Sequence, residues 1–223
     1  MQTSVDILGV KVLEPVATLT DLLVAAVNFY AFVQLHKGGS KEKATVYFKY
    51  FFLCMGVSTT LGGLIGHGFL YAFGFAWKLP GWVVGMGSVA FMERAAIKQA
   101  RGVMHQPFNT LLAYLNIAEL AIFILIAFYT LNFFYVEVHA TYGMLVMFSL
   151  EIFIYRKKKN RASRFIMWAV AVSALAAIAH LTKISFHTWF NYIDLSHVLM
   201  AVASYLFYLG ANKSKQEAIH KAK

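Results

Sequence analysis

The stretch IDLSHVLMAVASYLFYLG, from Ile193 to Gly210, is apolar enough to form a membrane-spanning helix, yet it opens with an aspartate and a histidine three residues apart. The whole chain has the same character, because 60% of its 223 residues are hydrophobic and only 13% are charged. A soluble domain does not carry this balance. The sequence therefore predicts an integral membrane protein with ionisable groups inside its spans.

Seven apolar segments have about the length that a membrane-spanning helix needs, roughly 20 residues. We expect an all-α fold, a seven-transmembrane helix bundle, formed by residues 1–212 and followed by a basic cytoplasmic tail, 213–223. No cleavable secretory signal is recognisable, so the first span is expected to be retained. The predicted spans are residues 15–36, 46–74, 80–99, 108–131, 133–155, 164–184 and 189–211.

The basic residues indicate an orientation, because lysine and arginine gather in cytoplasmic loops. The links after the first, third and fifth spans are basic, and so is the tail, whereas Lys78 and Lys183 are the main cations on the other side. We therefore expect an external N-terminus and a cytoplasmic C-terminus, in a plasma or inner membrane. The net charge of +10 is explained by loop anchors, and no nucleic-acid partner is expected. The pattern predicts no oligomeric state.

Polar residues of several spans fall in the outer half of the bilayer at a rise of about 1.5 Å per residue. Three stripes with helical spacing can converge there, and ionisable groups within spans are functional candidates. Glu93, Glu119 and Glu151 lie deeper or nearer the cytoplasm and are interpreted mainly as members of structural pairs, Glu93 with Lys98 or Arg94. The stripes are His187, Asn191, Asp194 and His197 on the last span; Glu14, Thr18, Asp21, Ala25 and Asn28 on the first; and Gly56, Thr60, Gly63 and His67, with small residues that permit close packing, on the second.

Two imidazoles and a carboxylate suit zinc with an open fourth position. We predict that His67, His197 and Asp194 bind the metal. Asp194 and His180 are the candidates for a catalytic role beside it. Glu14 and Asp21 either organise the first helix or bind a second cation such as calcium through oxygen ligands. Without metal, the same groups could relay protons.

Three short motifs resemble those of the alkaline ceramidases, members of the CREST superfamily of seven-span metal-dependent hydrolases. They are EPVATLTDLL (Glu14 to Leu23), GLIGHGF (Gly63 to Phe69) and DLSHVLMAVASYLF (Asp194 to Phe207). The resemblance implies that His67 and His197 are zinc ligands and that Glu14 is the first-span carboxylate. It also implies that Asp194, His180 or His139 completes the shell, and that the substrate is a membrane lipid with an amide or ester bond.

The sequence departs from the family pattern at positions that matter for catalysis. Gly63 stands where the family has a serine, and Ile193 stands four residues before His197 where the family has a second histidine. The third-span aspartate of the family has no evident equivalent. Two functions therefore stay open: a lipid amide or ester hydrolase, and a non-enzymatic lipid-binding receptor or proton-coupled transporter that uses the same His/Asp/Glu cluster.

Overall fold

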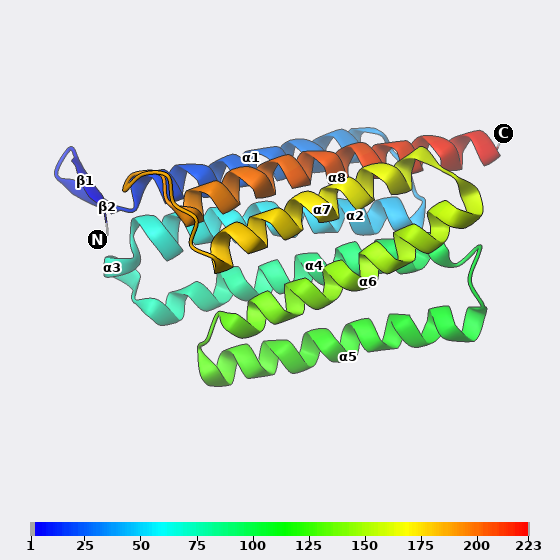
Figure 1. The fold of residues 1–223 in the computed structure, drawn as a ribbon, viewed down its shortest axis with the longest axis horizontal. Coiled ribbons are helices and arrows are strands. Elements are labelled where there is room, and N and C mark those ends of the chain that lie inside the picture. Colours follow the sequence, from blue (N-terminus) through cyan, green and yellow to red (C-terminus); the bar gives the residue numbers. More distant parts are fainter. Residues whose placement is uncertain (1–2, 223) are drawn as a thin grey trace.

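In the computed structural model, which describes residues 3–222, seven long helices form an antiparallel bundle behind a short N-terminal hairpin (Figure 1). The elements in chain order are β1 (Ser4–Ile7), β2 (Val10–Leu13), α1 (Pro15–Lys37), α2 (Lys43–Leu61), the π-helix η1 (Gly62–Gly68), α3 (Leu70–Phe73), the 3-10 helix η2 (Phe75–Lys78), α4 (Leu79–Ala100), α5 (Gln106–Thr130), α6 (Phe134–Lys158), α7 (Arg161–Leu181) and α8 (Tyr192–Ala222).

Six of these helices are long and apolar enough to cross a membrane, namely α1, α2 with η1, α5, α6, α7 and α8. Most of α5 faces outward, and only 11% of its most apolar window is buried inside the protein. Large side chains such as Leu125 and Phe128 are exposed on it, as expected for a surface in contact with lipid. The chain is thus a multi-pass integral membrane protein. The remaining long helix, α4, is less apolar because it contains Glu93, Arg94 and Lys98.

The predicted helix boundaries hold for five of the seven segments to within three residues. The second segment, predicted as 46–74, ends as a continuous helix at Gly68, because the chain leaves η1 at Phe69 and turns at Gly74, whose φ is 84°. The last segment, predicted to end at residue 211, continues as one helix to Ala222. The residues expected to form a separate tail therefore prolong α8. The hairpin of β1 and β2 was not predicted.

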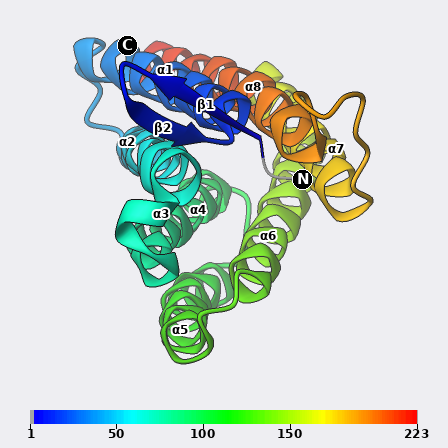
Figure 2. The same cartoon turned by 90° about the vertical axis from the view of Figure 1, so that its left-hand side faces the viewer.

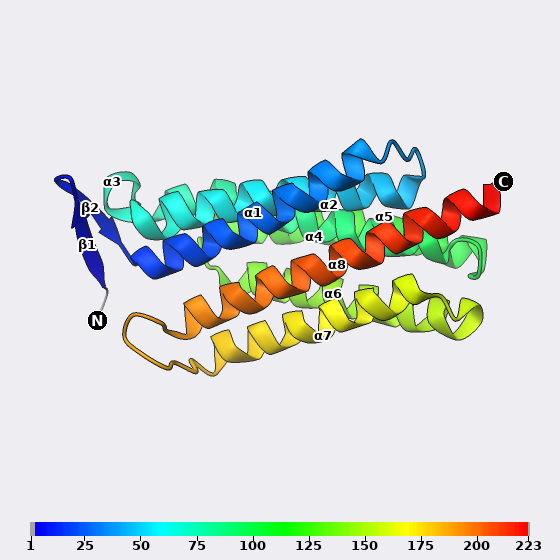
Figure 3. The same cartoon turned by 90° about the horizontal axis from the view of Figure 1, so that it is seen from above.

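The links between the helices gather at two opposite ends of the bundle (Figures 1 and 3), and these ends differ in charge. We call one the hairpin end, which consists of residues 3–13, 69–78, 131–133 and 182–191. The other is the basic end, which consists of the links 38–42, 101–105 and 159–160 with the adjoining helix termini. Cations gather there, among them Lys37, Lys41, Lys43, Lys98, Arg101, Arg156, Lys157, Lys158 and Lys159.

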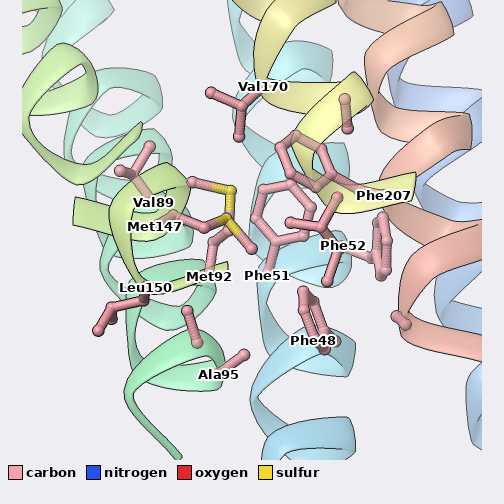
Figure 4. Close-up of a cluster of buried hydrophobic side chains, with 14 of the residues drawn as sticks. Phe48, Phe51, Phe52, Val89, Met92, Ala95, Met147, Leu150, Val170 and Phe207 are labelled. Carbon is pink, nitrogen blue, oxygen red and sulfur yellow. The ribbon is translucent and has the colours of Figure 1, made fainter. Parts of the chain in front are cut away.

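The hydrophobic core lies between the middle of the bundle and its basic end (Figure 4). Phe51 of α2 packs edge-on against Phe207 of α8, with ring centroids 5.6 Å apart. Met92 of α4 and Met147 of α6 are fully buried beside them. These contacts join α2, α4, α6 and α8 by apolar packing, and polar side chains gather instead near the hairpin end.

At the hairpin end, α1 packs against α2, η1 and α8 (Figure 2). The predicted stripes of the first and second spans lie on these segments, but only Asp194 and His197 of the last-span stripe lie on α8, because the helix begins at Tyr192 and His187 and Asn191 precede it. The bundle therefore brings together residues from the beginning, the first third and the end of the chain.

Candidate metal centre

Asp21 of α1, His67 of η1 and His197 of α8 form a group whose ligand atoms all lie within 4.8 Å of one another. The carboxylate of Asp21 faces both rings: Oδ2 is 3.8 Å from Nε2 of His67, and Oδ1 is 3.4 Å from Nε2 of His197. The two imidazole centroids are 5.7 Å apart. The predicted meeting of the second and last spans is therefore observed, with Asp21 as the carboxylate between them.

Glycines on the second span allow this approach. A Cβ atom at Gly63 would lie 3.0 Å from both the carbonyl oxygen of Thr18 and the Cβ of Asp21. A Cβ at Gly62 would lie 3.0 Å from Oδ2 of Asp21. Because a side chain at Gly63 would push against backbone, α1 and η1 can pack this closely only with glycine there. The stripe of small residues predicted from the sequence has this physical role.

The π-helical segment η1 presents His67 at its end. The backbone N–H of Phe69 donates to the carbonyl of Leu64, 2.8 Å away, which closes the wide i→i−5 turn. Such segments are rare and recur at functional sites. Since η1 continues α2 without interruption, a helix that is otherwise regular acquires a wider turn where the histidine must reach Asp21.

Each imidazole is oriented by a second hydrogen bond on its other nitrogen. Nδ1 of His67 lies 2.7 Å from Oε2 of Glu14, and Nδ1 of His197 lies 3.1 Å from Oγ1 of Thr20. The Thr20 hydroxyl can donate its hydrogen to the carbonyl of Val16 or Ala17, at 3.0 and 3.1 Å, and in that arrangement its oxygen can accept from Nδ1 of His197. With N–H on both Nδ1 atoms, the neutral rings direct the lone pairs of Nε2 toward Asp21.

This donor set fits a cation. Two nitrogen lone pairs and a carboxylate face each other, and acceptors repel unless a proton or a metal ion lies between them. Ligands about 2.0–2.1 Å from a tetrahedral zinc are about 3.3 Å apart. Here Oδ1 of Asp21 is 3.4 Å from Nε2 of His197, Oδ2 is 3.8 Å from Nε2 of His67, and one ligand atom of each residue lies within 4.8 Å of the others, so the group is wider than a closed zinc shell. The side chains of Asp21, His67 and His197 are 7%, 17% and 12% exposed. These three residues could thus hold a metal ion and leave a position open.

Glu14 is held in place by the hairpin. It has a left-handed backbone conformation, with a φ of 42°, at the start of α1, and non-glycine residues adopt this region at a cost. Its backbone N–H donates to the carbonyl of Thr3, 2.8 Å away. Glu14 and Asp21, predicted to organise the first helix or bind a cation such as calcium, both contact His67.

Asp194, which the sequence places among the metal ligands, lies beside the group and is not one of the three. It caps α8: its Oδ2 accepts the backbone N–H of Asn191 at 2.7 Å, and the side chain of Asn191 accepts the N–H of Ile193 at 2.8 Å. In this reciprocal capping, the Asp194 carboxylate points back toward the N-terminus of α8. Asp194 is 1% exposed, and its Oδ1 has no hydrogen-bond partner among residues 3–222. Its charge interacts with those of His67 and Glu14.

His180, the other predicted catalytic residue, lies at the end of α7. Its Nε2 is 3.5 Å from Oε1 of Glu137, and its ring packs edge-on against Tyr192 with centroids 5.3 Å apart. It is close enough to His197 for their charges to interact. His180, at the end of α7 and beside Glu137 of α6, therefore lies near the metal group.

His139 belongs to a different polar cluster, between α4, α5 and α6. Its Nδ1 is 2.7 Å from Oε1 of Glu119, and its Nε2 is 2.9 Å from the carbonyl oxygen of Met86. Glu93 is 1% exposed and its charge interacts with both Glu119 and His139. In the described part of the chain, Oε2 of Glu93 and Oε2 of Glu119 have no hydrogen-bond partner. His139 thus does not complete the shell around His67 and His197.

Sequence reasoning missed Thr20 and did not connect Lys78 with the site. Thr20 has no distinctive sequence signal beyond its position one residue before Asp21. Lys78 was noticed only as one of the two main cations on the side opposite the basic loops. It ends η2, and its charge interacts with Glu14 and Asp21; burial lowers the pKa of its ammonium group, while these two carboxylates act in the opposite direction.

Comparison with known proteins gives a family without an assigned activity. A family model described as "Family of unknown function (DUF6962)" matches residues 16–216, so the chain belongs to this family. No curated protein and no solved structure matches it. The matched range includes Asp21, His67 and His197 and leaves out Glu14 and the hairpin.

Proposed function

We propose that this member of a family of unknown function is a zinc-dependent membrane hydrolase that cleaves an amide or ester bond of a lipid. The observation that carries the proposal is the set of acceptor atoms of Asp21, His67 and His197, which face one another closely enough that they could hold one metal ion. The resemblance of the three motifs to alkaline ceramidases points to the same chemistry.

A zinc ion bound there would polarise a substrate carbonyl and acidify a coordinated water, so that hydrolysis could proceed near neutral pH. The protein supplies the arrangement around it. Glu14 and Thr20 hold the Nδ1 protons of His67 and His197, which fixes the rings with Nε2 toward Asp21. Such outer partners raise the basicity of histidine ligands.

Asp194 is the residue to which we assign proton transfer. Its buried Oδ1 is not used by the cap of α8, and its charge interacts with that of His67. A carboxylate beside the reacting water can accept its proton and pass it to the leaving group. The ammonium group of Lys78 interacts with the carboxylates of Glu14 and Asp21, and it can stabilise negative charge on the substrate.

The depth of the group favours a lipid substrate. Asp21 is the seventh residue of α1, so it lies about 9 Å from the start of that helix at 1.5 Å per residue. The amide and ester carbonyls of lipids lie between headgroups and acyl chains, at a comparable depth in the bilayer. A lipid can therefore present its scissile bond without leaving the membrane.

We further propose that all seven long helices cross the membrane, with the hairpin end outside and the basic end in the cytoplasm of a plasma or inner membrane. Although α4 is the least apolar of them, it begins directly after η2 at the hairpin end and ends at the link 101–105 of the basic end. A chain whose neighbouring helices cross the bilayer can connect these two ends only by crossing it as well. The distribution of cations supports the orientation.

The test is metal analysis of the full-length protein purified in detergent, together with lipid hydrolysis. We expect about one zinc per chain, lost in His67→Ala and His197→Ala and retained in His105→Ala, a control at an exposed histidine of the basic end. We also expect zinc-dependent release of fatty acid from an N-acyl or O-acyl lipid. Zinc binding without such release would overturn the hydrolase, and the absence of zinc after supplementation would overturn the metal site.

The cluster of Glu93, Glu119 and His139 favours a second candidate, a non-enzymatic proton-coupled transporter or receptor. Buried ionisable groups inside a bundle are typical of proton relays, and both carboxylates here have an oxygen without a partner among the described residues. In proteoliposomes with a pH-sensitive dye, this candidate predicts proton movement that Glu119→Gln abolishes. If the wild-type protein moves no protons under a pH gradient, this candidate is wrong.

A further inference from the structure

A cavity of about 340 Å³ opens at the basic end between α4 and α5, and Tyr47 of α2 also lines it. Its cations are Arg94, Lys98 and Arg101. These follow one another at intervals of four and three residues, so a single face of α4 and its last turn points them into the cavity. The volume is within the range of cavities that bind small ligands.

Within the described part of the chain, the positive charge of this cavity is only partly balanced, because the charge of Arg94 interacts with that of the adjacent Glu93. No carboxylate oxygen among the described residues lies within salt-bridge distance of Arg94, Lys98 or Arg101, since every ion pair found there involves a histidine. Lys98 is repelled by Arg101 and by Lys43 of α2. Gathering like charges in a partly buried cavity costs free energy unless an anion binds.

A carboxylate that interacts with Lys98 is already used. Glu42 interacts with Lys98 at a distance, but it caps α2: its Oε1 accepts the backbone N–H of Ala44 at 3.0 Å, and its Oε2 accepts that of Thr45 at 2.7 Å. A carboxylate held by a helix N-terminus has little remaining capacity for a lysine. An external anion is therefore needed to complete the site.

The cavity also has apolar lining. Ile97 of α4 and Ala113 and Ile117 of α5 line it together with the polar residues Asn109 and Thr110 of α5, and α5 is the least buried of the candidate spans. Tyr114, also in the lining, is 69% exposed on the same side. Cations near the membrane surface with apolar walls beneath them match the order of groups in a phospholipid, whose phosphate lies above its acyl chains.

We propose that this cavity binds the phosphate ester of an anionic phospholipid, with Arg94, Lys98 and Arg101 around the phosphate and Ile97, Ala113 and Ile117 against the upper acyl chains. Guanidinium groups bind phosphate oxygens in pairs, which gives the site its preference for phosphate over other anions. This site lies at the end of the bundle opposite Asp21, and its existence does not depend on the hydrolase proposal.

The experiment uses the full-length protein in detergent micelles supplemented with dioleoyl phosphatidylglycerol, dioleoyl phosphatidic acid or dioleoyl phosphatidylcholine. Retained lipid is counted by native mass spectrometry, and the unfolding temperature is recorded with each lipid. Glycerol 3-phosphate and inorganic phosphate form the soluble arm. We expect the two anionic lipids to be retained and to raise the unfolding temperature, with a weaker effect of phosphatidylcholine and of the soluble phosphates.

The key variant is the double substitution Lys98→Gln and Arg101→Gln, which should weaken binding of the anionic lipids about thirtyfold, because two near-surface cations are removed. The matched control is Lys41→Gln with Arg156→Gln, which removes the same charge from exposed positions of the same end outside the cavity. If both pairs weaken binding equally, binding is general attraction to the basic end and the site is overturned.

A second variant tests the lipid site even if the loss of charge at Lys98 and Arg101 impairs folding. Ala113→Phe fills the apolar wall and changes no charge, so it should also abolish lipid retention while the protein without lipid unfolds cooperatively. Soluble phosphates that bind as tightly as the lipids would overturn the lipid source of the phosphate. Retention of neither anionic lipid by the wild-type protein would overturn the proposal as a whole.

Discussion

At the scale of single residues, the candidate metal centre depends on which nitrogen of each histidine carries its proton. Thr20 and Glu14 hydrogen-bond the Nδ1 atoms of His197 and His67 and so influence where these protons lie. Neither residue belongs to the group of three candidate ligands. The Thr20 hydroxyl has its hydrogen available to the carbonyls of its own helix and an oxygen lone pair for His197. A hydroxyl at this position therefore selects the histidine tautomer that can bind metal.

Thr20→Val should weaken zinc binding about 10- to 100-fold, the range found when outer-shell partners of histidine ligands are removed. Valine has nearly the same shape but cannot accept the N–H of His197. Thr20→Ser keeps the hydroxyl and should bind zinc with nearly wild-type affinity. Competition with a zinc-binding dye measures both. Equal affinity of the valine and serine variants would show that the hydroxyl has no part in zinc binding.

Asp21→Asn is expected to remove zinc binding without unfolding the protein. The amide N–H₂ can donate to the Nε2 lone pair of either histidine, so hydrogen bonds replace the repulsion between acceptors. Chelator treatment should therefore lower the unfolding temperature of the wild-type protein, which loses a ligand bound only in the folded state, and leave that of the variant unchanged. A chelator effect of the same size on both proteins would contradict the assignment of Asp21 as a ligand.

At the scale of elements, the contact between α1 and η1 determines the geometry of the site. Gly63 has no room for a Cβ, because the carbonyl of Thr18 and the Cβ of Asp21 would each be 3.0 Å from it. Gly66, three residues later in the same π-helix, has no atom within 4 Å of an added Cβ. Substitution by alanine at Gly63 and at Gly66 therefore compares a crowded position with an open one in the same π-helix.

Gly63→Ala should lower the free energy of unfolding by about 1–3 kcal/mol, the usual cost of overpacking, and should also weaken zinc binding because Asp21 is displaced. Gly66→Ala should leave zinc binding unchanged and be neutral or slightly stabilising, since alanine is favoured over glycine in helices by about 1 kcal/mol. Thermal unfolding in detergent, with and without zinc, distinguishes them. If Gly66→Ala is the more damaging change, the close approach of α1 and η1 is not what positions the site.

Sequence patterns were sufficient for the helices and for the pairing of His67 with His197, because apolar length gives the spans and spacing of three and four residues gives the faces. They placed Asp194 with the two histidines, whereas the structure groups Asp21 with them. Both lie on the right face at similar depth, and only the close packing of α1 on η1 and the cap at Asn191 separate them. The π-helix and the hairpin also escaped prediction, since each depends on tertiary contacts and leaves no periodic signal.

At the scale of the whole molecule, the uneven distribution of charge gives the bundle a direction. The candidate metal centre is near the hairpin end, whereas the cations and the cavity between α4 and α5 are at the basic end. In the proposed orientation, the two sites face opposite leaflets. A lipid bound in the cavity would therefore not compete with a lipid substrate at the metal centre.

The proposed topology predicts which positions a membrane-impermeant maleimide reaches in intact cells. In a Cys54→Ala background, Thr188→Cys and Ala76→Cys should react from outside, and Lys41→Cys and Gly102→Cys should react only after permeabilisation; all four positions are exposed. The pair at residues 76 and 102 tests whether α4 crosses the membrane. Labelling of both members of this pair from the same side would exclude a seventh span.

The N-terminal hairpin has a practical consequence for anyone who produces this protein. The chain at Thr3 supplies the carbonyl that fixes the backbone of Glu14, and the hydroxyl of Tyr71 donates to the carbonyl of Lys11 on the second strand at 2.8 Å. An affinity tag fused directly before these strands would lie next to the candidate metal centre and could disturb the contacts that hold Glu14. Purification handles and fluorescent fusions therefore belong after α8, at the opposite end of the bundle.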